Sequence, residues 1–199
     1  MIRVAPDAEG ISQAAAALKQ GGVIMYPTET VYGLGADPSN LSALERLFRI
    51  KERDPHKPVL LLIGRLEQIK PLIHELSPAA QRCVDTFWPG PLSLVLPARK
   101  EVPACLAPDG KVCIRYTSSP MAADLCRQFG SALTSTSANR SGEPAATDLG
   151  ALTLPGVALG IDAGPLPPSP PSTVYDPDEG RVLRQGAILE AELTAHCRG

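Results

Sequence analysis

A stretch near the N-terminus gathers side chains that can bind charge. It runs from Tyr26 to Gly35, reads Tyr-Pro-Thr-Glu-Thr-Val-Tyr-Gly-Leu-Gly, and follows the short apolar run Val23 to Met25. Hydroxyl, carboxylate and phenol groups crowd together here, and the two glycines permit a positive φ or the close approach of another group. A strand that ends in polar groups and glycines is typical of the ligand-binding edge of α/β sheets. A polar loop without a ligand fits these residues equally well.

A second stretch, from Ala132 to Gly142, repeats this pattern with Ala-Leu-Thr-Ser-Thr-Ser-Ala-Asn-Arg-Ser-Gly. Ser135, Ser137 and Asn139 provide neutral hydrogen-bonding groups of little bulk, which suit phosphate oxygens or the polar groups of adenine or an amino acid. The alternative is a hydroxyl-rich capped turn. The occurrence of two such strand ends in one chain favours a binding site.

Cations accompany both stretches. Lys51 lies three residues after Phe48 and four after Leu47, so it projects from the edge of the buried face of a predicted helix. The helix dipole explains one cation at a helix C-terminus, but it explains less well the density of basic residues between Arg46 and Lys57. Arg115 falls on a predicted inner strand, where it needs either a buried carboxylate or a ligand anion as its partner.

These groups together predict an anionic ligand such as a nucleotide. The cations are Lys51, Arg53, Lys57, Arg115 and Arg184, and the neutral groups are Thr30, Ser135, Ser137, Asn139 and Ser172. They also suit phosphoryl or nucleotidyl transfer, where positioning and charge stabilisation do most of the chemistry. The chain lacks a phosphate loop, a full dinucleotide fingerprint, a nucleophile elbow and a His-x-x-x-His pair.

Composition indicates an ordinary globular domain. The chain has 199 residues, a net charge of −2, 44% hydrophobic and 20% charged residues. No apolar run approaches the roughly 18 residues of a membrane helix, and the N-terminus lacks a signal-peptide pattern, so we expect a cytosolic protein without membrane contact. The five cysteines form no Cys-x-x-Cys pair and no zinc spacing, which favours reduced, mostly buried thiols.

The elements that must position these groups alternate between helices and strands. Expected helices cover 11–20, 40–52, 66–76 with a break at Pro71, 78–87, 120–129 and a short piece at 148–153. Expected strands cover 23–25, 59–63, 92–96, 112–116, 132–135, 157–161, 172–176 and 181–184. Residues 164–171 are proline-rich and extended, and residues 187–199 are expected to form a loose C-terminal tail.

The motifs resemble those of the YrdC-type threonylcarbamoyl-adenylate synthases, in the family's order and spacing. They are Tyr26 to Gly35, Lys51-x-Arg53, Trp88-Pro-Gly-Pro91, Arg115, Ser135 to Gly142, Ser172-Thr-Val-x-Asp176 and Arg184-x-Gly186. The resemblance implies one α/β domain over 1–188, built on a large twisted mixed β-sheet flanked by helices, with a concave ligand-binding face. Residues 189–199 would follow it as a tail.

The resemblance also implies an activity. L-threonine, bicarbonate and ATP would give threonylcarbamoyl-AMP and pyrophosphate, with Mg²⁺ travelling with the pyrophosphate. A separate transferase complex would then modify the tRNA adenosine beside the anticodon, and the protein itself is a candidate for tRNA or RNA contact.

Position by position, the family's functional residues carry over in two groups. Lys51 and Arg53 match the catalytic pair, and the wider ATP set is Lys51, Arg53, Lys57, Ser137, Asn139 and Arg184. The threonine set is Thr30, Arg115, Ser135 and Ser172, with Arg115 taking the carboxylate. No protein metal ligand is assigned by the resemblance.

Two alternatives keep the fold and change the function. One is a paralogue that binds RNA on the concave face without making the adenylate, although the net charge of −2 argues against strong nonspecific RNA binding. The other is a carbamoyl-phosphate-processing domain like that of hydrogenase maturation proteins, which carry zinc-finger and acylphosphatase segments that this sequence lacks.

Overall fold

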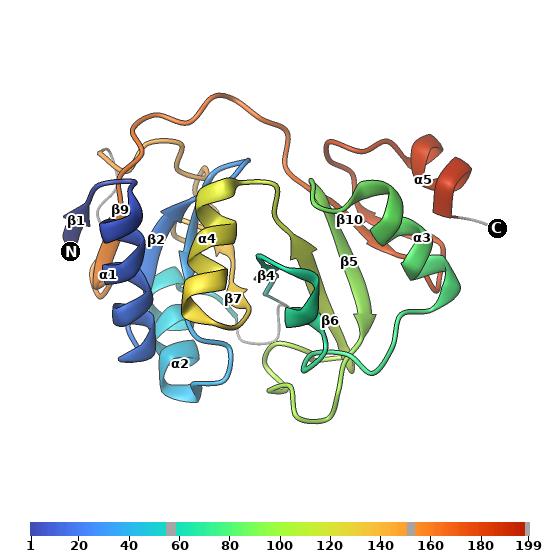
Figure 1. Ribbon diagram of the computed structural model, residues 1–199, viewed down its shortest axis with the longest axis horizontal. Helices are drawn as coiled ribbons and strands as arrows, with labels where there is room; N and C mark the ends of the chain where they lie inside the picture. Colours follow the sequence, from blue (N-terminus) through green and yellow to red (C-terminus); the bar gives the residue numbers. More distant parts are fainter. Residues whose placement is uncertain (55–58, 151–153, 198–199) are drawn as a thin grey trace.

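The chain folds into alternating helices and strands (Figure 1). The computed structural model describes residues 1–54, 59–150 and 154–197. The helices are α1 (Ala8–Lys19), α2 (Leu41–Lys51), the short 3-10 helix Leu66–Ile69, α3 (Pro78–Phe87), α4 (Pro120–Phe129) and α5 (Glu190–Cys197). The strands are β1 (Ile2–Val4), β2 (Ile24–Pro27), β3 (Tyr32–Gly35), β4 (Leu61–Ile63), β5 (Leu92–Pro97), β6 (Lys111–Tyr116), β7 (Leu133–Thr134), β8 (Thr136–Ser137), β9 (Leu159–Ile161), β10 (Thr173–Asp176) and β11 (Arg181–Arg184).

The strands form two mixed sheets. The first has the order β1-β9-β2-β3-β8, and the second has the order β11-β10-β5-β6-β4-β7. The mixed α/β domain expected from the sequence is confirmed, with its strands divided between these two sheets instead of running through a single one. Both sheets combine parallel and antiparallel pairs, as β9 with β2 and β2 with β3 show in the first sheet.

The segment from Leu133 to Ser137 joins the two sheets. Its first half, β7, pairs with β4 in the second sheet, and its second half, β8, pairs with β3 in the first. Ser135 lies at the crossing, where its backbone N–H donates a 2.7 Å hydrogen bond to the Leu60 carbonyl. The predicted hydroxyl-rich stretch therefore lies where the sheets meet.

Side-chain alternation along β2 distributes the core over both faces of the first sheet. Ile24 and Tyr26 point to a cluster that includes residues of α1 and α4, whereas Met25 points to the larger cluster that includes α2. Helices α1 and α4 lie side by side over the first of these faces, and α3 and α5 pack together at the opposite end of the molecule (Figure 1).

Local capping fixes the helix starts that the sequence predicts. The side chains of Asn40, Ser77 and Ser119 each accept a hydrogen bond from a backbone N–H in the first turn of α2, α3 and α4. Pro78 and Pro120 occupy the first helical position, where a missing N–H costs nothing. Asn40 thus sets the point at which α2 begins, and the left-handed Glu52 ends it directly after Lys51.

Three expectations about secondary structure are wrong. Only Leu66–Ile69 of the expected 66–76 helix forms, as a 3-10 helix, and Pro71, which lacks a backbone N–H, cannot continue its hydrogen bonding. Residues 148–150 are not helical, and the rest of that expected helix lies outside the described residues. The predicted loose tail contains α5, whose Leu193 is fully buried.

One expectation about the cysteines is also wrong. Cys83 in α3 and Cys197 in α5 form a disulfide, with Cα atoms 5.3 Å apart. Cys105, Cys113 and Cys126 are free thiols, as expected. A pairing between positions 114 residues apart depends on how α5 docks, which the spacing of cysteines does not reveal.

Within the part of the chain that the structure describes, no helix is long and apolar enough to cross a membrane.

Candidate functional site

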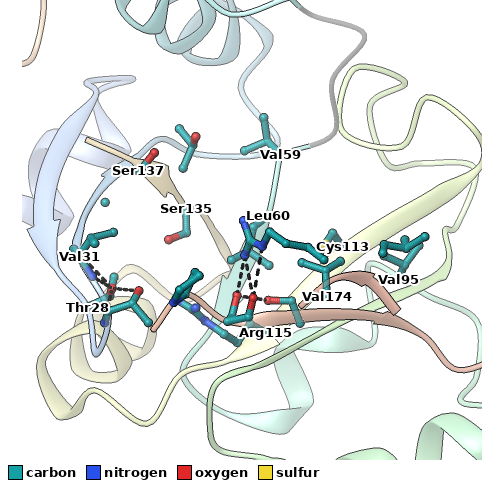
Figure 2. A pocket seen from close by; sticks show the side chains of 18 of the residues that line it. Thr28, Val31, Val59, Leu60, Val95, Cys113, Arg115, Ser135, Ser137 and Val174 are labelled. Carbon is teal, nitrogen blue, oxygen red and sulfur yellow. Dashed lines mark hydrogen bonds between the residues drawn. The ribbon is translucent and has the colours of Figure 1, made fainter. Parts of the chain in front are cut away.

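A cavity of about 920 Å³ opens over one face of the second sheet. Its floor comes from alternate residues of neighbouring strands, since side chains two apart share a face. These floor residues are Ser93, Val95, Cys113, Arg115, Val174 and Asp176. Figure 2 shows Cys113, Arg115, Val95 and Val174 around this space, with Ser135 and Ser137 facing it from the junction of the sheets. The strict alternation predicted for β6 is confirmed, because Ile114 packs in the core.

The cavity brings together most of the predicted site. The predicted residues that line it are Thr30, Arg53, Arg115, Ser135, Ser137, Ser172 and Arg184. Lys51 and Asn139 do not line it but lie directly behind Ser137. Lys57, predicted as an ATP contact, lies outside the described residues.

Gly33 and Gly35 are required for close approach and not for a positive φ. A Cβ on Gly35 would lie 2.7 Å from a ring carbon of the fully buried Tyr26. A Cβ on Gly33 would lie 3.3 Å from the Ser135 hydroxyl, in the lining of the cavity. The Gly-Leu-Gly spacing thus leaves room on the neighbouring strands for the Tyr26 ring and the Ser135 hydroxyl.

The turn between β2 and β3 is held by the hydroxyl of Thr28. That oxygen accepts from the backbone N–H of Thr30 at 3.2 Å and donates to the Val31 carbonyl at 2.7 Å. It also lies 3.1 Å from the Thr30 hydroxyl. The turn therefore presents Thr30 to the cavity in a fixed orientation, and Figure 2 shows Thr28 and Val31 at this side of the site.

Arg115 lies in the floor of the cavity with only 3% of its surface exposed. Its Nε lies 3.4 Å from Oε1 of Glu29, which belongs to the turn between β2 and β3. The other oxygen of Glu29 accepts a 2.6 Å hydrogen bond from the Thr117 hydroxyl. Of the two partners considered for Arg115 from the sequence, the structure therefore contains the buried carboxylate, and the guanidinium also borders the cavity where a ligand anion would bind.

Arg184 and Ser172 form a second polar group in the cavity. The Arg184 Nη2 donates 3.0 Å hydrogen bonds to the Ser172 carbonyl and the Ser172 hydroxyl. The Ser172 hydroxyl also lies 2.9 Å from that of Ser93. Burial lowers the pKa of Arg184, and the positive charge of Arg115 adds to this effect. Two guanidiniums close to one cavity make it favourable for an anionic ligand.

Lys51 is 3% exposed, and its ammonium is surrounded by oxygen atoms of the second hydroxyl-rich stretch. It donates to the Ser137 carbonyl at 2.6 Å and the Ser137 hydroxyl at 3.1 Å, and it also contacts Asn139 through the carbonyl and the side-chain oxygen. None of these oxygens carries a full negative charge. Burial, with a smaller effect from Arg53, therefore lowers the pKa of Lys51 to about 8.

Arg53 follows α2 after Glu52, which ends the helix in a left-handed conformation with φ of 51°. Its backbone N–H donates to the Phe48 carbonyl at 3.0 Å, and its side chain lines the cavity. Burial lowers the pKa of Arg53. The Lys-x-Arg spacing thus places one cation behind Ser137 and the other at the cavity.

Sequence reasoning missed several lining residues. Ser93, Cys113 and Asp176 line the cavity but were not predicted as site residues. The alternation of side chains along the predicted strands could have identified such residues. Cys113, for example, lies two residues before Arg115 and therefore shares its face of the sheet. Glu29 is the carboxylate of the first stretch. Its contact with Arg115, 86 positions away in the sequence, can be recognised only from the three-dimensional structure.

Metal ligands were not assigned from the sequence. Among the residues that the structure describes, no three His, Cys, Asp or Glu side chains come together as a metal site would require. The acidic residues at the cavity include Asp109, Asp176 and Glu179. Asp176 and Glu179 both accept from the Lys111 ammonium, at 2.5 and 2.8 Å. These side chains do not resemble an all-protein Mg²⁺ cage.

The chain is similar to several known proteins. Residues 16–186 match the family model Sua5_yciO_yrdC, described as telomere recombination. A relative from Alkalilimnicola ehrlichii, named threonylcarbamoyl-AMP synthase, is 41% identical over 184 residues that cover 87% of this chain and 94% of that protein.

Solved structures share the fold. The crystal structure of P. abyssi Sua5 complexed with L-threonine superposes with a TM-score of 0.87 at 31% identity and covers 98% of this chain. This chain spans 59% of the length of that protein. The crystal structure of E. coli YciO superposes with a TM-score of 0.81 at 28% identity, covering 94% of this chain and 95% of that one.

Proposed function

Since this chain belongs to the Sua5/YciO/YrdC family, we propose that it is a threonylcarbamoyl-AMP synthase that acts as a nucleotidyltransferase. Its substrates are L-threonine, bicarbonate and ATP. The name of the similar proteins supports this function over the RNA-binding paralogue, since relatives called threonylcarbamoyl-AMP synthase match nearly their full length.

The observation that carries the proposal is the single cavity that unites both predicted groups. Arg53 and Ser137 from the ATP set face the same space as Thr30 and Arg115 from the threonine set. A volume of about 920 Å³ lies at the upper end of the usual range for ligand pockets, which suits a nucleotide beside an amino acid. Holding both reactants side by side supplies much of the rate enhancement in a transfer of this kind.

The reaction has two steps. A bond forms between the threonine nitrogen and the carbon of bicarbonate, and water leaves to give a carbamate. The carbamate oxygen then attacks the α-phosphorus of ATP, the bond to the bridging oxygen breaks, and pyrophosphate leaves with the electron pair.

The residues divide between these reactants. Arg115 receives the threonine carboxylate, while Thr30, Ser135 and Ser172 contact the rest of the amino acid. Arg53 stabilises the negative charge that develops on the phosphates, and Lys51 acts with it by holding Ser137 and Asn139. Arg184 completes the ATP set. Lys57 remains a predicted ATP contact.

Mg²⁺ belongs to the nucleotide in this proposal. A cation bound to the phosphates would neutralise charge on the leaving pyrophosphate. Asp176 and Glu179 offer it at most outer contacts, since both already accept hydrogen bonds from Lys111. The handover of the product to a transferase complex, tRNA contact and the cytosolic location stay predictions.

The test is to incubate the purified protein with MgATP, L-threonine and bicarbonate and to measure pyrophosphate. We expect release that depends on both threonine and bicarbonate, and a sharp loss in Arg53→Ala. Arg127→Ala is the matched control, because Arg127 pairs with Asp124 on the surface, away from the cavity. Pyrophosphate release that is indifferent to threonine would contradict the proposal.

A further inference from the structure

Two buried polar atoms that face each other lack hydrogen-bond partners. Across the described ranges 1–54, 59–150 and 154–197, the unsatisfied buried side-chain atoms are Oε1 of Glu29 and Nε of Arg115. They lie 3.4 Å apart, within the range of an ion pair but without hydrogen-bond geometry. Buried polar atoms are satisfied in most native structures, so a facing pair of exceptions calls for a specific reason.

Glu29 is held from the other side. Thr117 donates a 2.6 Å hydrogen bond to Oε2 of Glu29, and the same Thr117 oxygen accepts a 3.1 Å bond from the Ser119 N–H at the start of α4. Thr117 follows β6, two residues after Arg115. The Glu29 carboxylate is therefore anchored to the end of the strand that carries Arg115. Its other oxygen, Oε1, faces the Nε of Arg115.

This arrangement has a consequence for the orientation of the guanidinium. Arg115 carries donors on Nε and on two terminal nitrogens in one plane. A carboxylate beside Nε attracts that edge of the group and leaves the terminal nitrogens for the cavity, where they match the two oxygens of a ligand carboxylate. We propose that Glu29 is a positioning residue that holds Arg115 for recognition of the substrate carboxylate.

The proposal rests on the proposed function, in which Arg115 receives the carboxylate of threonine. Glu29 acts through Arg115 and does not itself line the cavity. Its effect should therefore appear in the discrimination between ligands with and without a carboxylate. A purely structural effect would weaken both kinds of ligand alike.

The test compares the affinities for L-threonine and L-threoninamide by calorimetry, in the presence of a non-hydrolysable ATP analogue. A charge-assisted pair of hydrogen bonds predicts that the wild type prefers threonine by about tenfold or more. Arg115→Ala should abolish that preference. Glu29→Gln, which keeps the shape but removes the charge, should reduce it severalfold without abolishing it, with a higher KM for threonine and an unchanged KM for ATP.

Two further variants sharpen the result. Glu29→Asp keeps the charge at a longer distance, so its preference should lie between those of the wild type and Glu29→Gln. Thr117→Val removes the hydroxyl that anchors the carboxylate and should also reduce the preference, which keeps the test informative if Glu29→Gln fails to fold. Asp124→Asn is the matched control, since Asp124 forms a surface ion pair with Arg127.

The outcomes separate the two claims. Absence of threonine preference in the wild type, or its survival in Arg115→Ala, would contradict the proposed role of Arg115. A preference that Arg115→Ala abolishes but that folded Glu29→Gln and Thr117→Val keep in full would overturn the role of Glu29 alone.

Discussion

The ammonium of Lys51 donates a 2.6 Å hydrogen bond to the backbone carbonyl of Ser137, so the lysine lies behind the cavity wall and not in it. An ammonium has three donors, and here it faces oxygens of Ser137 and Asn139. Lys51 therefore shapes the phosphate side of the site by fixing the segment that carries these residues.

A pH dependence of ATP affinity follows. Burial lowers the pKa of Lys51 to about 8, so the ammonium is present below this pH and is lost above it. We predict that ATP affinity falls as the pH rises from about 7 to about 9.5, because a neutral amine loses one donor and turns a lone pair toward the surrounding oxygens. With a pKa of about 6, a phosphate group is about nine-tenths ionised at the lower end of this range, and its further ionisation adds negative charge and does not explain a decline in affinity.

The measurement is calorimetric titration with an ATP analogue, without threonine, whose amine titrates in the same range. Lys51→Arg keeps its charge throughout and should give a flat profile. Lys100→Ala, an exposed lysine, serves as the control and should follow the wild type. The same decline in Lys51→Arg would assign the titration to another group.

The contact between Arg184 and Ser172 predicts that the two substrates bind cooperatively. Arg184 belongs to the ATP set and Ser172 to the threonine set, and they share a 3.0 Å hydrogen bond. We expect the ATP analogue to raise threonine affinity by about fivefold, a typical coupling between sites. Ser172→Ala should remove most of this coupling, and threonine should raise ATP affinity by the same factor in the wild type. Equal threonine affinity with and without the analogue would refute the coupling.

The two glycines of the first stretch should respond differently to alanine. Gly35→Ala places a Cβ 2.7 Å from the buried Tyr26 ring and should lower the free energy of unfolding by about 1–3 kcal/mol. Gly33→Ala has a 3.3 Å contact with the Ser135 hydroxyl, so it should leave folding nearly intact and weaken threonine binding. Denaturant unfolding and threonine titration of both variants provide the check. Equal stability of the two would contradict this account of the spacing.

The disulfide predicts both a thiol count and a stability effect. Under denaturing conditions without reductant, titration should find three free thiols, Cys105, Cys113 and Cys126. The bridge between Cys83 and Cys197 closes a long loop, and Cys197→Ser should lower the free energy of unfolding by about 2–5 kcal/mol. Leu193→Ala in α5, without change to the bridge, tests the docking of the helix separately. A titration that finds all cysteines free before reduction would contradict the bridge.

Local signals predicted much of the fold. Asn40 and Ser119 cap the expected helices, and the alternation along β6 correctly turned Arg115 to the face opposite Ile114. These features depend on residues close in sequence. The division into two sheets depends instead on the crossing at Ser135, which links β4 and β3 through tertiary hydrogen bonds.

The candidate site shows the same contrast. Residue types identified the cations and hydroxyls, and the resemblance assigned their roles. The position of Lys51 behind Ser137 could not be predicted, since a lysine at the edge of a buried helix face can reach either a cavity or a neighbouring backbone. The docking of α5 was missed because its apolar pattern is weak and its burial depends on tertiary contacts such as those with α3.

The central claim is that the cavity joins threonine, bicarbonate and ATP in one product. The most direct measurement is mass spectrometry of the nucleotide formed from MgATP, L-threonine and carbon-13 bicarbonate. We expect threonylcarbamoyl-AMP that carries a single heavy carbon. A nucleotide product without the label, as in a threonyl adenylate formed through the amino-acid carboxylate, or no adenylate at all, would contradict it.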